Sequence, residues 1–249
     1  MRPLEPKSLD PIQKTPVTSF LDNALDPPVR GFLHSPQTPN SHALILAHGA
    51  GGNCNAPLLV ALAETFCAHG YTVLRCDLPF RQAKPFGPPF PGQAERDRAG
   101  LRNPVTAMRK AVASAQTAVQ TEPARKNSGG KIFLGGHSYG GRQSTILCAD
   151  EPDLVDGLLL LSYPLHPPRK PDQLRTAHLP NLRAPSLFVH GTRDPFGSIE
   201  EIKKALQLIP AKTGLIEVEG AGHDLGFKGK QTAPDLPDRV FARFAEMLG

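Results

Sequence analysis

Continuous apolar runs alternate along this chain with segments in which apolar residues recur three and four positions apart. A short apolar run bounded by turn residues indicates a strand covered on both faces, whereas the three-and-four spacing indicates an amphipathic helix. The strand candidates are residues 17–21, 29–34, 43–47, 71–76, 132–135, 157–162, 186–190 and 213–218. The helix candidates are residues 58–69, 103–119, a segment through Gln143 and Leu147, 199–208 and 236–248.

The order of these elements predicts an α/β fold. The first two strands are joined by a short turn at Asp26-Pro27-Pro28, which favours antiparallel pairing. The later strands alternate with helices, a pattern typical of a parallel sheet with helices on both faces. We therefore predict a mostly parallel, doubly wound sheet of about eight strands with an antiparallel start.

One domain is expected over most of the chain, because no internal repeat or linker divides it. We predict that this domain covers residues 16–249. Residues 1–15 are proline-rich and polar, and we expect them to form a poorly packed N-terminal arm.

The helical and strand patterns break between residues 78 and 100. Five prolines and three phenylalanines fall between Pro79 and Pro91, so we predict a long apolar loop. Such loops are more often functional than idle. Phe80 and Phe86 are candidates for an apolar wall of a binding cleft, although they could instead anchor the loop to the body of the protein.

The sequence Gly136-His137-Ser138-Tyr139-Gly140 links a predicted strand to a predicted helix. A G-x-S-x-G motif is common by itself, but in this setting it predicts a sharp turn that exposes the serine hydroxyl. The flanking glycines allow strand and helix to approach closely. The hydroxyl would then lie at a helix N-terminus, where backbone N–H groups favour negative charge. The alternative is a glycine-rich turn with an incidental serine.

A serine nucleophile needs a base and a group that orients the base. In open parallel sheets such groups gather at the carboxyl ends of strands. Asp194 follows the seventh predicted strand and His223 follows the eighth, which gives the chain order Ser138, Asp194, His223. Asp77 and Asp224 compete with Asp194 for the acidic role.

Two further histidines lie near these candidates in sequence. His137 is adjacent to Ser138, and we expect its side chain to point elsewhere. His190 lies within a strand, so we expect it to be a core residue or to support the site from behind.

An oxyanion hole would require two N–H donors. We predict the backbone N–H of Tyr139 as one donor, and the loop after the third strand as the source of the other. In that loop, residues 48–52 read HGAGG, and we favour Ala50 with Gly51 second. The loop could instead hold a phosphate, but it lacks the Gly-Lys-Ser/Thr ending of a P-loop.

Arg81 and Arg142 are the candidates for binding an anionic substrate group, because a guanidinium matches a carboxylate. Arg142 could instead pair with a structural acid such as Asp77.

Composition narrows the possible partners. The formal charge is +5 and tryptophan is absent, and no long Lys/Arg run is present, so we predict no nucleic-acid partner. The basic segment 96–110 is better explained as a solvated helix face. The four cysteines lack C-x-x-C spacing, so a zinc or redox motif is not indicated. We also predict no metal and no cofactor, because chemistry by Ser138, His223 and Asp194 requires neither. The N-terminus lacks an apolar run, and no segment is long enough to span a bilayer. We therefore predict a cytoplasmic protein without membrane contact. We expect it to be a monomer or a dimer.

Five stretches together resemble the α/β-hydrolase superfamily over roughly 30–249. These stretches are AHGAGG, FLGGHSYGGR, GLLLLSYPLHPP, LFVHGTRDPFG and EGAGHDL. The chain looks dienelactone-hydrolase-like, and closer still to the family of testis-expressed protein thirty and subunit three of the non-specific-lethal complex. His137 departs from the animal members, in which arginine would be expected. Many α/β-hydrolases carry a cap domain after the sixth strand. Here the segment 163–185 is too short for one, which predicts an open or lightly covered cleft.

These observations predict a serine hydrolase that cleaves a small ester or lactone through Ser138, His223 and Asp194. One alternative is a non-catalytic interaction module that keeps the hydrolase shape. A peptidase is the other alternative, because G-x-S-Y-G-G also looks like the serine turn of prolyl-oligopeptidase relatives. We expect no propeller domain that could hold a peptide, which weighs against the peptidase.

Overall fold

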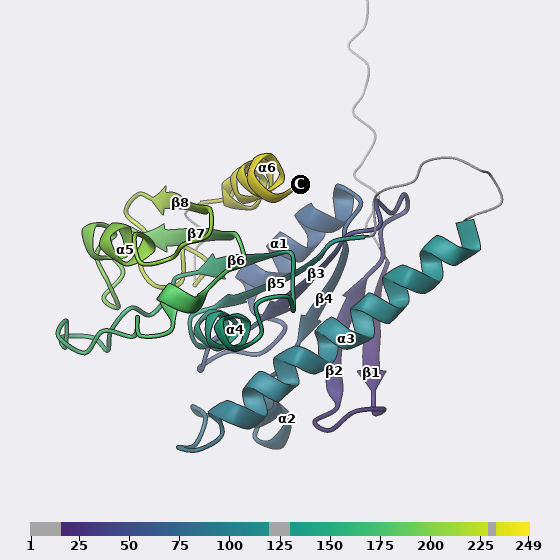
Figure 1. The fold of residues 1–249 in the computed structure, drawn as a ribbon, viewed down its shortest axis with the longest axis horizontal. Helices are drawn as coiled ribbons and strands as arrows, with labels where there is room; N and C mark the ends of the chain where they lie inside the picture. Colours follow the sequence, from purple (N-terminus) through teal and green to yellow (C-terminus); the bar gives the residue numbers. More distant parts are fainter. Residues whose placement is uncertain (1–15, 120–129, 229–232) are drawn as a thin grey trace, which may run out of the picture.

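A single eight-stranded sheet organises the protein, seen in a computed structural model that describes residues 16–119, 130–228 and 233–249 (Figure 1). The predicted arm at 1–15 lies outside these residues. The strands are β1 Val17–Asp22, β2 Val29–His34, β3 Ala43–Ala47, β4 Thr72–Cys76, β5 Ile132–His137, β6 Gly157–Leu161, β7 Ser186–Gly191 and β8 Thr213–Val218. Their spatial order is β1-β2-β4-β3-β5-β6-β7-β8. The first two pairings are antiparallel and the rest are parallel, which confirms the predicted fold class.

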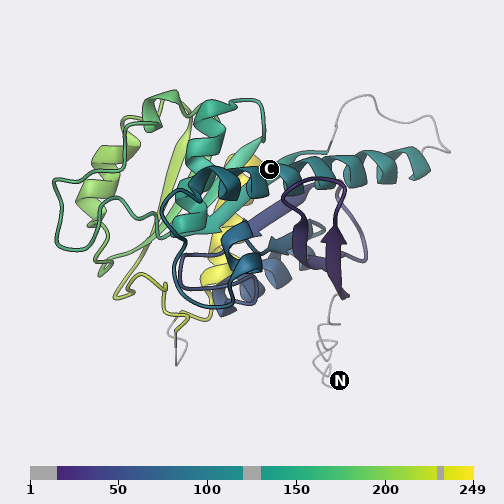
Figure 2. The same ribbon diagram turned by 90° about the horizontal axis from the view of Figure 1, so that it is seen from below.

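Helices cover both faces of the sheet. They are α1 Pro57–Ala68, α2 Pro79–Ala83, α3 Ala94–Val119, α4 Tyr139–Asp150, α5 Ile199–Leu206 and α6 Leu236–Leu248, with a short 3-10 helix at Leu179–Asn181. Helices α1 and α6 pack on one face, and α3, α4 and α5 pack on the other (Figures 1 and 2). In Figure 2 the long helix α3 runs across its face of the sheet and extends past the strands.

The continuous apolar runs of the central strands follow from this layering. In β3, Leu44 and Leu46 face the core beneath α1 and α6, while Ile45 faces the core beneath α3 and α4. All three side chains are fully buried. Burying one such side chain contributes about 1.5–3 kcal/mol, so a strand of this kind has no position that favours a polar residue.

The region between residues 78 and 100 was predicted as a loop, which is confirmed for residues 84–93 only. Helix α2 occupies its first part, and α3 begins at Ala94 rather than near residue 103. Pro79 is the first residue of α2, where the missing N–H costs nothing because that group has no partner inside the helix. Pro104 lies inside α3 and is accommodated there. Pro79 was therefore a misleading stop signal, whereas Pro104 lies within the helix predicted over residues 103–119.

The carboxyl ends of β3, β5, β7 and β8 carry the loops that hold the candidate site. The segment between β6 and β7 contains only the short 3-10 helix, so no separate cap domain stands over these loops. Among the described residues, no helix has the length and apolar character needed to cross a membrane.

Candidate active site

Ser138 lies on a strained turn between β5 and α4, with φ 53° and ψ −114°. A non-glycine residue in this region typically costs about 1–3 kcal/mol. The turn closes because its neighbours lack side chains. A Cβ on Gly136 would lie 2.6 Å from the Gly141 nitrogen, and one on Gly140 would lie 2.6 Å from the His48 carbonyl oxygen. The strain is therefore maintained by tight backbone packing on both sides of the serine.

An unbroken chain of hydrogen bonds joins the three residues of the predicted triad. His223 Nε2 lies 2.8 Å from Ser138 Oγ, and His223 Nδ1 lies 2.8 Å from Asp194 Oδ2. An ionised carboxylate only accepts, so Nδ1 carries the proton and Nε2 is left to accept from the serine hydroxyl. The hydrogen-bond order is the one predicted for a serine, a base and an acid that orients the base.

The surroundings of Asp194 fix its carboxylate. Its side chain is fully buried, and Oδ1 accepts a hydrogen bond of 2.9 Å from the Phe196 N–H. The ring of Phe196 lies against the imidazole of His223, with 4.2 Å between centroids. His190 donates from Nε2 to the Gly197 carbonyl at 2.8 Å and lies 3.8 Å from Asp194 Oδ2. It is 1% exposed, which confirms the expectation of a buried supporting residue.

The two competing acids are engaged elsewhere. Asp77 accepts from the Cys54 N–H at 2.7 Å. Asp224 accepts from the Gly226 and Lys228 N–H groups at 3.2 and 3.0 Å. Neither has a side-chain hydrogen bond to His223 among the described residues, so Asp194 is the carboxylate that contacts the imidazole there.

His137 was expected to point away from the site, and this expectation is wrong. Its Nε2 donates to the His223 carbonyl oxygen at 2.7 Å. Burial lowers the pKa of His137 to about 4, which keeps the ring neutral. The residue before Ser138 therefore ties the turn that carries His223 to the end of β5. Its position at the end of a strand could have indicated this role.

The side chain of Tyr139 points towards the N-terminal end of α3. Its hydroxyl donates to Asp97 Oδ2 at 2.8 Å, and Asp97 Oδ1 accepts from the Phe80 N–H at 3.0 Å. Asp97 is fully buried, and this burial raises its pKa. The backbone N–H of Tyr139 remains at the first position of α4, the place predicted for an oxyanion donor.

The loop after β3 lies directly against the serine turn. A Cβ on Gly49 would lie 3.2 Å from Ser138 Cβ, whereas one on Gly51 would meet nothing within 4 Å. Within the described part of the chain, the N–H groups of Ala50 and Gly51 donate to no protein acceptor. Both candidate donors are thus unpaired near Ser138.

A cavity of about 590 Å³ lies in front of these groups. Its walls include Ser138, His223 and the loop after β3, together with apolar side chains that the sequence did not indicate. The latter are Leu58, Leu59, Phe196 and Phe227. Helix α1 begins shortly after the glycine loop, and this position could have indicated that Leu58 and Leu59 line the cavity.

None of the four predicted substrate-binding residues lines this cavity. Phe80 is 2% exposed and packs against His48 and Tyr139, so it belongs to the core. Phe86 is 80% exposed. Arg81 binds backbone carbonyls. Arg142 makes no ion pair with Asp77 among the described residues, and its buried Nε has no hydrogen-bond partner there.

Comparison with known proteins identifies the class. The family model described as an alpha/beta hydrolase domain matches residues 40–246, so the chain belongs to this family. Dienelactone hydrolase from Anabaena variabilis is similar, with 20% identity, a TM-score of 0.62, and coverage of 95% of this chain and 100% of that one.

Two further solved structures share the fold. An alpha-beta serine hydrolase homologue from Coxiella burnetii is 17% identical, with a TM-score of 0.66 and coverage of 91% of this chain and 96% of that one. A serine hydrolase without lid from Xanthomonas campestris is 16% identical, with a TM-score of 0.64 and coverage of 99% and 98%. At these identities the similarity establishes the fold alone.

Proposed function

We propose that the protein is a serine hydrolase that cleaves a small ester or lactone through an acyl-enzyme. The observation that carries the proposal is the hydrogen-bonded chain from Ser138 Oγ through His223 to the buried Asp194, at the wall of a cavity. The narrower relationship to the testis-expressed protein thirty and non-specific-lethal subunit three family remains part of this proposal.

The geometry suggests the following steps. Ser138 Oγ attacks the substrate carbonyl carbon while His223 Nε2 takes the hydroxyl proton. Asp194 stays ionised and stabilises the imidazolium. The tetrahedral oxyanion receives hydrogen bonds from the Tyr139 N–H and from the Ala50 or Gly51 N–H. The intermediate then expels the alcohol, which takes the proton from His223. Water attacks the acyl-enzyme by the same route, and in a lactone the alcohol stays tethered to the acid.

The cavity favours a compact substrate with an apolar acyl or ring portion. Its volume of about 590 Å³ lies within the usual range for small-molecule sites, roughly 300–1,000 Å³. Leu58, Leu59, Phe196 and Phe227 supply apolar contacts. The similarity to a dienelactone hydrolase supports including lactones among the substrates to be tested.

Labelling with a fluorophosphonate, which reacts with activated serines, tests the proposal. We expect the wild type to be labelled and Ser138→Ala to remain unlabelled. Ser186→Ala is the matched control, because Ser186 Oγ donates to the Ala184 carbonyl at the start of β7, and this variant should label like the wild type. With p-nitrophenyl esters and lactones, Ser138→Ala should lower kcat by about 10⁴-fold or more. An unlabelled, inactive wild type would favour the non-catalytic interaction module.

A further inference from the structure

Arg81 is a buried cation that binds the glycine loop rather than a carboxylate. Its exposed fraction is 7%, and within the described residues it forms no ion pair. Nε donates to the Gly52 carbonyl at 2.7 Å, and Nη2 donates to the Ala50 carbonyl at 2.9 Å. Further bonds reach the Lys84 and Gly87 carbonyls at 3.2 and 2.9 Å. The guanidinium therefore connects the glycine loop to the proline-rich segment after α2.

These bonds determine where an N–H group points. A peptide unit is planar and trans, so its C=O and the N–H of the next residue point in opposite directions. Holding the Ala50 oxygen against Arg81 directs the Gly51 N–H away from Arg81. Gly51 lines the cavity, and a Cβ built on it meets no atom. The N–H that Arg81 orients is thus one of the two unpaired candidate oxyanion donors.

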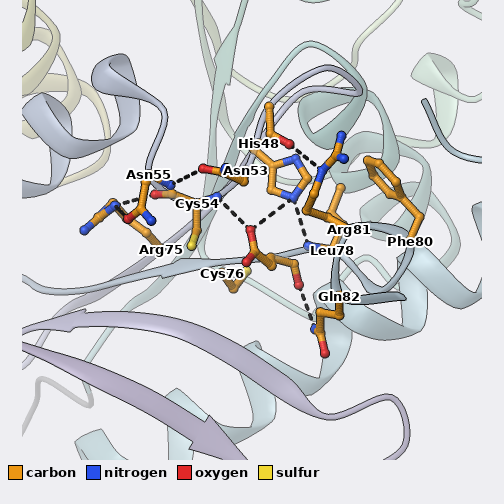
Figure 3. Close-up of polar contacts among 12 residues, drawn as sticks. His48, Asn53, Cys54, Asn55, Arg75, Cys76, Leu78, Phe80, Arg81 and Gln82 are labelled. Carbon is orange, nitrogen blue, oxygen red and sulfur yellow. Dashed lines mark hydrogen bonds and ion pairs between the residues drawn. The ribbon is translucent and has the colours of Figure 1, made fainter. Parts of the chain in front are cut away.

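The neighbouring peptide is held separately. His48 Nε2 accepts from the Leu78 N–H at 3.1 Å (Figure 3), and its Nδ1 donates to the Gly49 carbonyl at 2.8 Å. Burial lowers the pKa of His48, and the neutral ring can make both bonds. This contact sets the Gly49–Ala50 peptide and leaves the Ala50–Gly51 peptide to Arg81.

The charge on Arg81 adds to the geometric effect. A guanidinium that donates to the Ala50 carbonyl polarises that amide, and hydrogen bonds in a chain strengthen one another. The Gly51 N–H becomes a stronger donor as a result. Because no described carboxylate pairs with Arg81, its positive charge also favours negative charge developing beyond the loop.

We propose that Arg81 is a positioning residue of the oxyanion hole, which aims and polarises the Gly51 N–H through the Ala50 carbonyl. The inference rests on the proposed hydrolase function. It replaces the earlier expectation that Arg81 holds a substrate carboxylate. A positioning residue of this kind affects the transition state and leaves the binding of the substrate in its ground state nearly unchanged.

The test compares Arg81→Met and Arg81→Lys with the wild type in the full chain. The matched control is Arg102→Met, which removes an ion pair between α3 and Glu151. Glu151 follows the C-terminal end of α4, and Ser138 precedes the N-terminal end of the same helix. Three quantities are measured: kcat and KM for a p-nitrophenyl ester, inhibition by an alkyl boronic acid that forms a tetrahedral adduct with serine, and endpoint fluorophosphonate labelling, which counts intact sites.

We expect Arg81→Met to lower kcat per labelled site by about 10- to 100-fold with KM changed less than about threefold. Its affinity for the boronic acid should fall by a similar factor. Arg81→Lys keeps the positive charge but loses the several N–H donors of the guanidinium, so its decrease in kcat should be smaller. If Arg81→Met does not fold, the lysine variant must show the same division between kcat and KM. Arg102→Met should retain wild-type values.

Three results would overturn the inference. Unchanged kcat per labelled site in both variants, with an active wild type, would overturn it alone. A loss explained entirely by fewer labelled sites would mean that Arg81 only stabilises the fold, and would also overturn it. A wild type that neither labels nor turns over would overturn the proposed function and the inference together.

Discussion

The candidate site has two halves that depend on the chain in different ways. One half consists of Ser138, His223 and Asp194, whose side chains are held at the ends of three strands. The other half is the glycine loop after β3, which offers backbone N–H groups and is oriented by Arg81 and His48. Side-chain chemistry leaves a motif in the sequence. Backbone chemistry depends on residues outside the loop that carry no motif.

The side-chain half should be the more sensitive to substitution. Asp194→Asn should lower kcat by about 10³- to 10⁴-fold, because an amide in place of the carboxylate favours the wrong tautomer of His223. Asp224→Asn is the matched control, since its carboxylate binds only backbone N–H groups next to the same histidine among the described contacts. Ester hydrolysis by the purified variants measures both. Equal losses would remove Asp194 from its proposed role.

The backbone half can be probed by adding single methyl groups. Gly49→Ala should lower kcat/KM by about 10- to 100-fold, because a misplacement near 1 Å can cost that much. The new Cβ would lie 2.9 Å from His137 Nδ1 and 3.2 Å from Ser138 Cβ, so the loop or the ring must move. Gly51→Ala meets no atom and should lose less. The reverse order in an ester assay would mean that open space at Gly51 matters more than the contact at Gly49.

His137 binds the His223 carbonyl oxygen in one half and lies close to Gly49 in the other. Its effect on stability should depend on pH. The folded-state pKa is about 4 because of burial, below the ordinary 6.5. The unfolded chain therefore binds more protons between these values, and stability is lost as pH falls from about 6.5 towards 4. His137→Gln keeps an N–H donor without titrating. Urea unfolding at several pH values measures the free energy of unfolding. As the pH falls, that of the variant should rise relative to the wild type by up to about 3 kcal/mol. Parallel curves would contradict this.

Much of the fold could be predicted from sequence because its signals are local. The central strands are buried on both faces, so their apolar runs stand out. Ser138 directly follows β5, and Asp194 and His223 lie in the loops after β7 and β8. Helix α2 and the start of α3 were missed because proline was read as a stop signal, although Pro79 suits a first helical position. Contact partners were missed for another reason. Arg81 lies 31 residues from Ala50, and only the folded backbone shows which carbonyl it reaches.

The buried carboxylate of Asp97 has a practical consequence for engineering. It joins the start of α3 to Tyr139 and to Phe80, so three elements share one acceptor behind the serine turn. A library that randomises Tyr139 to widen the cleft would remove the hydroxyl that donates to the buried Asp97 carboxylate. Substrate range is better explored at Leu58 and Phe227, which border the cavity and take no part in that network.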